Sequence, residues 1–80
     1  MPTVLVVGSY RFFFYSRENA EPAHIHVESG DRIAKYWLEP AELASSKRFK
    51  AHELTTLWKL VAEYQEAFLK AWHDHLDPEE

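Results

Sequence analysis

The chain has 80 residues, a formal net charge of −4 and no cysteine. This length fits a single small domain, residues 1–80, and the lack of cysteine excludes disulfides and zinc–thiolate sites. We see no signal peptide and no apolar run near the roughly 20 residues that span a bilayer, so we expect a cytoplasmic protein. A chain this short buries only about 60% of the surface that its unfolded form exposes, and such domains often gain stability from self-association or from a partner.

The charges are unevenly distributed along the chain. Residues 1–50 carry seven Lys and Arg against six Asp and Glu, whereas residues 51–80 carry two against seven. A local basic cluster, formed by Lys47, Arg48 and Lys50, precedes the acidic C-terminal part. The acidic balance argues against a dedicated nucleic-acid binder.

The N-terminal part reads as strands and a loop. Thr3 to Val7 is a short apolar run that ends at Gly8-Ser9, a turn signal. Tyr10 to Tyr15 is almost wholly aromatic, which predicts a strand. Ser16 to Pro22 is polar and ends at a proline, so we expect a loop there.

A hairpin is predicted next, from His24–Glu28 and Arg32–Leu38. Its two-residue turn is either Ser29-Gly30 or Gly30-Asp31, and both choices divide the faces in the same way. One face is apolar and should meet the core: Ile25, Val27, Ala34, Tyr36 and Leu38. The other face is mixed, as expected of a functional or partner-facing surface: His24, His26, Glu28, Ile33, Lys35 and Trp37.

The pattern changes to helical between Ala51 and Leu76. Apolar residues recur there in steps of three and four, at Leu54, Leu57, Trp58, Val61, Tyr64, Phe68 and Trp72. Pro40 to Ser46 should hold a turn or a short helix, and Lys50 is a poor N-cap. The predicted fold is therefore α+β, with a three- to four-stranded antiparallel sheet packed against one long C-terminal helix.

The aromatic run raises the question of what covers the second face of the sheet. Phe12 and Phe14 should point one way, and Phe13 and Tyr15 the other. One helix covers only one side of such a sheet. A partner, a second copy or a folded-back segment should therefore cover the other side, and this favours an interaction protein.

Several short motifs in order resemble the domain-of-unknown-function family 4160. They are Gly8-x-Tyr10-Arg-Phe-Phe-Phe-Tyr-Ser16, Glu21-Pro-x-His-Ile-His-Val27, Ala34-Lys-Tyr-Trp-Leu38 with Pro40, and Glu53-Leu54, with Trp72 near the end. The resemblance covers nearly the whole chain and implies a small prokaryotic protein without an established activity. Members are often encoded beside another small domain, an arrangement that resembles a toxin–antitoxin pair. This chain departs from the pattern at Ala23, and at Lys47-Arg48-Phe49, where a glycine often precedes the phenylalanine.

Three functions remain open. The leading hypothesis is a cytosolic protein-interaction component of a toxin–antitoxin-like gene pair, which binds a protein partner or a second copy of itself. The first alternative is a metal-independent ribonuclease toxin, with nucleic acid as the partner and His24, His26 and Lys35 as acid, base and cation. The second alternative is a His-x-His metal-binding domain, with Glu21 or Glu28 as the third ligand. We assign no cofactor and no metal ligands, and we do not decide whether the chain is an enzyme. The candidate binding residues are Arg11, Tyr15, Arg17, Tyr36 and Trp37.

Overall fold

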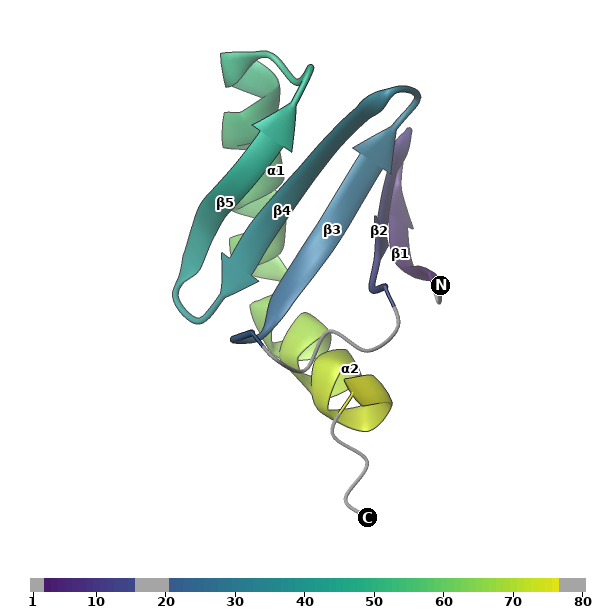
Figure 1. The fold of residues 1–80 in the computed structure, drawn as a ribbon, viewed down its shortest axis with the longest axis vertical. Coiled ribbons are helices and arrows are strands. Elements are labelled where there is room, and N and C mark those ends of the chain that lie inside the picture. The colour runs from purple at the N-terminus through teal and green to yellow at the C-terminus, as the bar shows by residue number, and fades with distance from the viewer. Residues whose placement is uncertain (1–2, 16–20, 77–80) are drawn as a thin grey trace.

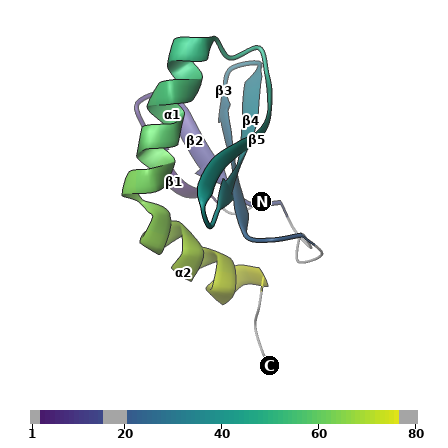
Figure 2. The same cartoon turned by 90° about the vertical axis from the view of Figure 1, so that its left-hand side faces the viewer.

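The computed structural model describes residues 3–15 and 21–76 of the chain. Within them, five strands form one antiparallel sheet in chain order, and two helices pack against it (Figure 1). The strands are β1 (Thr3–Val7), β2 (Tyr10–Phe13), β3 (His24–Ser29), β4 (Arg32–Leu38) and β5 (Ala41–Lys47), and the helices are α1 (Ala51–Glu63) and α2 (Gln65–Leu76). Helix α1 lies on one side of the sheet, and α2 runs from that side beneath the end of the sheet (Figure 2). The α+β class is therefore confirmed, while the number of elements differs from the prediction.

The sheet has five strands rather than three or four. The segment expected to hold a turn or short helix, Pro40 to Ser46, lies instead mostly in β5, which pairs with β4 from Leu38↔Ala41 to Ile33↔Lys47. The ladder shifts register between Lys35 and Tyr36, so Ala44 is an extra residue that faces no partner of its own. The sequence of β5 has low strand propensity, and its backbone pairing with β4 decides its conformation.

The predicted single helix is two helices, because the chain bends at Tyr64. This residue has φ −100° and ψ 17°, outside the helical range. Backbone hydrogen bonds from Tyr64 to Leu60 and from Phe68 to Tyr64 run across the junction, so it is a bend and not a loop. The side-chain amide of Gln65 donates to the Leu38 carbonyl at the end of β4. Figure 2 shows the resulting change of direction, which carries α2 along the end of the sheet.

Each of two tight hairpin turns begins with a glycine. Val7 pairs with Tyr10 around Gly8-Ser9, and Ser29 pairs with Arg32 around Gly30-Asp31, which selects the second of the two turns predicted for that hairpin. Gly8 and Gly30 have φ values of +58° and +63°. Positive φ at the first turn position is the requirement that favours glycine in two-residue hairpins.

The core lies between the helices and one face of the sheet. The predicted division of the central hairpin is confirmed, since Ile25, Val27, Tyr36 and Leu38 are fully buried and Ala34 nearly so. Helix residues complete this core from the other side, among them Leu57, Val61, Phe68 and Trp72. The Tyr36 hydroxyl donates to the Leu54 carbonyl at 2.7 Å, which ties β4 to α1. Burial raises the pKa of Tyr36 to about 12.

The start of α1 is held by Glu53 rather than by the N-cap side chain. Lys50 occupies the N-cap position, as expected, and its backbone N–H donates to Glu53 Oε1 at 2.9 Å. The other carboxylate oxygen of Glu53 accepts a hydrogen bond from the Arg32 guanidinium of β4. The Lys50 N–H, and to a lesser extent the positive charge of Arg32, hold the pKa of Glu53 below its usual value.

Arg48 lies in the left-handed backbone region, with φ +75°. A side chain there crowds the following carbonyl at a cost of about 1–2 kcal/mol, and glycine avoids that cost. The observation gives a physical reason for the glycine that often precedes the phenylalanine in the resembled family.

We therefore expect Arg48→Gly to raise the free energy of unfolding by up to about 1 kcal/mol, measured by urea denaturation. The substitution also removes the exposed Arg48–Asp31 ion pair (2.9 Å), and such pairs contribute about 0–1 kcal/mol. Arg48→Ala is the matched control, because it loses the same ion pair but keeps a β-carbon. Equal stability of the two variants would rule out backbone strain at this position.

None of the helices in the described part of the chain is long and apolar enough to cross a membrane.

Candidate functional site

The face of the sheet opposite the helices, which we call the open face, gathers most of the predicted site residues. The β3–β4 register places His24 beside Trp37, His26 beside Lys35 and Glu28 beside Ile33. Strand β2 adds Arg11 opposite Glu28, and Phe13 opposite His26. In the described part of the chain, no helix crosses this face (Figure 2). The site is therefore a surface built by three adjacent strands.

Four rings form a continuous aromatic cluster on the open face. His26 stacks on Phe13 with ring centroids 5.6 Å apart, and Tyr15 meets His26 edge-on at 4.5 Å. The His24 ring lies 5.1 Å from that of His26. The contacts between Tyr15, Phe13 and His26 bury Phe13 almost completely and leave Tyr15 about one third exposed. Such edge-to-face and offset contacts add to the stability that burial supplies.

The two cations that β2 and β4 place on the open face, Arg11 and Lys35, are paired with carboxylates. Arg11 Nη1 lies 2.8 Å from Glu28 Oε2, and Lys35 Nζ lies 2.6 Å from Glu21 Oε1. Arg11 also lies 4.4 Å above the Phe13 ring, and the Lys35 ammonium lies 4.7 Å from the centre of the Trp37 ring. The face therefore has nearly balanced charge, with aromatic surface between the ion pairs.

His24 is a structural link rather than an exposed group. Its side chain is fully buried, and its ring centroid lies 4.8 Å from that of Trp72 on α2. Nδ1 lies 2.9 Å from the Pro22 carbonyl. Because a carbonyl oxygen only accepts, Nδ1 is the protonated nitrogen of this hydrogen bond. The ring thus joins the start of β3 to the helix, and solvent does not reach it.

The remaining predicted residues lie elsewhere. Tyr36 is on the helix-covered face, with its ring in the core and its hydroxyl bound to Leu54, so that ring is not on the surface that carries the other candidates. The prediction for Arg17 falls outside the described residues. Glu21, which pairs with Lys35, was considered only as a metal ligand, and Trp72 only as a core residue. Sequence spacing does not predict either contact, because both join distant parts of the chain.

The described residues around the His-x-His pair do not complete a set of metal ligands. Among the described residues, no three His, Asp or Glu side chains come together as a metal-binding group. Of the two proposed third ligands, Glu28 pairs with Arg11, and Glu21 pairs with Lys35 while lying 3.9 Å from His24 Nδ1.

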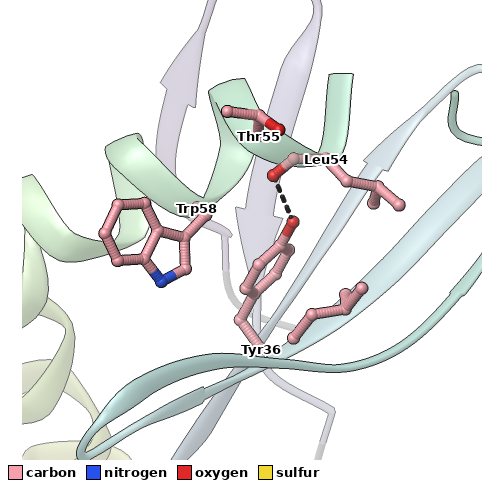
Figure 3. Close-up of a pocket in the computed structure, with 5 residues that line it drawn as sticks. Tyr36, Leu54, Thr55 and Trp58 are labelled. Atoms are coloured by element: carbon pink, nitrogen blue, oxygen red, sulfur yellow. Dashed lines mark hydrogen bonds between the residues drawn. The ribbon is translucent and has the colours of Figure 1, made fainter. Parts of the chain in front are cut away.

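A second feature, which the sequence did not reveal, lies on the other side of the molecule. A pocket of about 250 Å³ opens between β5 and α1, lined by Tyr36, Leu43, Leu54, Thr55 and Trp58 (Figure 3). Trp58 was predicted as part of the buried helix stripe, yet it is 46% exposed. Around the helix axis, Trp58 is about 40° from Leu54, which places it at the margin of the apolar stripe. This marginal position is the sequence signal for its exposure.

Fold and surface together define a small α+β protein with a five-stranded meander, helices on one face and an aromatic, charge-paired surface on the other. The family model "Domain of unknown function (DUF4160)" matches residues 9–73, and the chain belongs to this family. The match includes the strands of the open face and ends in α2. Searches of curated proteins and of solved structures give no match.

Proposed function

We propose that the protein acts by binding a protein partner through the open face, as one component of a toxin–antitoxin-like gene pair in the prokaryotic cytoplasm. The observation that carries this proposal is the open face itself, where aromatic rings lie between ion pairs on a sheet surface that no described helix covers. Aromatic and arginine side chains of this kind are typical of interface hot spots. The gene-pair arrangement is supported only by what the family resemblance implies.

The charge balance supports a protein partner over RNA. Phosphate binding needs cations that are free to replace counterions, whereas Arg11 and Lys35 already have carboxylates at 2.8 and 2.6 Å. A ribonuclease reading is favoured by the register that sets His26 beside Lys35, with the His24 ring 5.1 Å from His26. It is opposed by the burial of His24, because a general acid or base must reach its substrate.

The first experiment is co-expression with the protein encoded beside it, followed by size-exclusion chromatography and a measured dissociation constant. We expect a complex that Tyr15→Ala with Trp37→Ala weakens at least tenfold, since loss of a buried aromatic anchor commonly costs about 2 kcal/mol. Thr56→Ala is the control, because Thr56 is exposed on α1, away from the open face. An undiminished complex in the double variant would contradict binding through this surface.

The same expression strains test the nuclease alternative. The wild type alone should leave growth and total RNA unchanged if binding is its function. RNA cleavage by the wild type that is lost in a folded His26→Ala variant would instead assign the open face to catalysis. His26 is the better probe of the pair, because replacing the fully buried His24 also removes its contact with Trp72.

A further inference from the structure

The surface of the pocket between β5 and α1 is almost entirely apolar. Its polar groups are used within the chain: the Tyr36 hydroxyl donates to Leu54 O at 2.7 Å, and the Thr55 hydroxyl lies 3.2 Å from Ala51 O (Figure 3). The Trp58 indole N–H donates to Ala41 O at 2.7 Å, which fixes the ring beside the first residue of β5. A ligand in this pocket therefore has no unsatisfied side-chain partner and must bring an apolar group.

The pocket adjoins a sheet edge. Strand β5 is the last strand of the sheet, so its outer side is not paired with another strand in the described residues. Leu43 on this strand is 43% exposed, and it faces the half-exposed Trp58 across the pocket. A groove between an edge strand and a helix is a recurrent binding site for extended peptides, in which backbone runs along the strand and one side chain fills a pocket.

Two lysines without a carboxylate partner among the described residues lie on the α1 side of this groove. Most described Lys and Arg side chains have a carboxylate partner: Arg11, Arg32, Lys35, Arg48 and Lys70. The described basic side chains without a carboxylate partner are Lys47, Lys50 and Lys59. Lys50 precedes α1 and Lys59 follows Trp58 on α1, whereas Lys47 pairs with Ile33 and therefore faces the open side of the sheet. Glu42 of β5 pairs with Trp37 and likewise faces the open side, so it does not offset the charges of Lys50 and Lys59 beside the groove.

We propose that the β5–α1 groove binds an acidic peptide segment of a partner protein, with one aliphatic or aromatic side chain of that segment inserted into the pocket. The apolar pocket would accept the apolar side chain of the peptide, and Lys50 and Lys59 would attract its acidic flanks. A nucleic acid fits less well, because base recognition needs free donors and acceptors and the pocket offers none. This surface is separate from the open face, so the two binding proposals stand or fall independently.

Blocked heptapeptides test the proposal directly. The probe has a central leucine between two runs of three glutamates, and its matched peptides carry a central serine or lysine flanks. Titration into ¹⁵N-labelled protein should give saturable shifts at the Trp58 indole N–H and at the Leu43 and Leu54 amides. The serine peptide should bind at least about tenfold more weakly, because burial of a leucine side chain contributes about 1.5–3 kcal/mol.

Protein variants then separate the contribution of the apolar pocket to peptide binding from that of the lysine charges. Trp58→Ala should weaken the leucine peptide at least about tenfold, and Lys50→Glu with Lys59→Glu should weaken it several-fold in a manner that added salt reduces. Leu43→Asp provides a second anchor variant at an exposed site in case Trp58→Ala does not fold. Lys70→Glu on α2 is the charge control and should bind as the wild type does.

Four outcomes would overturn the proposal. They are no saturable shift with the leucine peptide, equal binding of the serine peptide, shifts confined to the open face, and tighter binding of the lysine-flanked peptide or of a single-stranded oligonucleotide. A change of oligomeric state in Trp58→Ala, seen by sedimentation, would likewise overturn it and assign the groove to a second copy of the chain.

Discussion

Phe68→Ala is expected to lower the free energy of unfolding by about 3–5 kcal/mol, the usual cost of removing a buried phenylalanine ring. Phe68 is 1% exposed, and its ring centroid lies 5.3 Å from that of Phe12 on β2 and 6.1 Å from that of Tyr64. The ring therefore joins α2 to the sheet and to the helix bend. A domain of this size has a total stability of about 4–12 kcal/mol, so this loss is a large fraction of the free energy of unfolding.

Urea denaturation followed by circular dichroism measures this effect. Phe68→Leu should lose much less, because leucine fills most of the same volume. Lys70→Ala on the same helix is the control: its side chain is 79% exposed, and we expect a change within about 0.5 kcal/mol. A loss below about 1 kcal/mol in Phe68→Ala would mean that α2 does not depend on this contact for its position.

The second large effect is a loss of stability at alkaline pH through Tyr36. Burial raises the pKa of this phenol from 10.0 to about 12 in the folded protein. Between these values the folded state holds the proton more tightly than the unfolded state, so stability falls as pH rises. The contribution of Tyr36 is complete below pH 10 and decreases by about 2–3 kcal/mol by pH 12. Ionisation also removes the hydrogen bond to Leu54.

The matched variant is Tyr36→Phe, which cannot ionise. At neutral pH it should be less stable than the wild type by about 1 kcal/mol, because the Leu54 carbonyl loses its donor. Between pH 10 and 12 the stability difference between the two proteins should shrink and then reverse. Other groups that titrate in this range are common to both proteins and cancel in the comparison. Parallel curves for the two proteins would show that the phenol does not titrate as described.

The two proposed binding surfaces depend on different features of the fold. The open face follows from strand alternation, because the side chains of β2, β3 and β4 that point away from α1 all lie on the same surface of the sheet. The β5–α1 groove depends on how far α1 lies from the last strand, and that distance is set by Tyr36 packing and by the hydrogen bond from Trp58 to Ala41. A partner on one surface leaves the other available.

Local sequence patterns were sufficient to predict the faces of the central hairpin and the helical C-terminal region. Alternation in the central hairpin placed Ile25, Val27 and Tyr36 in the core and His26 with Lys35 on the other face, and the structure has this arrangement. The period of two in a strand is a property of the backbone, so it can be read without knowing what the strand packs against. The long apolar stripe likewise predicted helix between Ala51 and Leu76, apart from the bend at Tyr64.

The remaining features depend on contacts between distant parts of the chain. Strand β5 forms because its backbone groups pair with β4, although its composition has little strand preference. The helix bends where Gln65 reaches the end of β4, and this bend brings Trp72 against His24. The burial of His24, the pairing of Lys35 with Glu21 and the pocket beside Trp58 all join residues far apart in the chain. Such contacts depend on packing in three dimensions, which local sequence patterns do not encode.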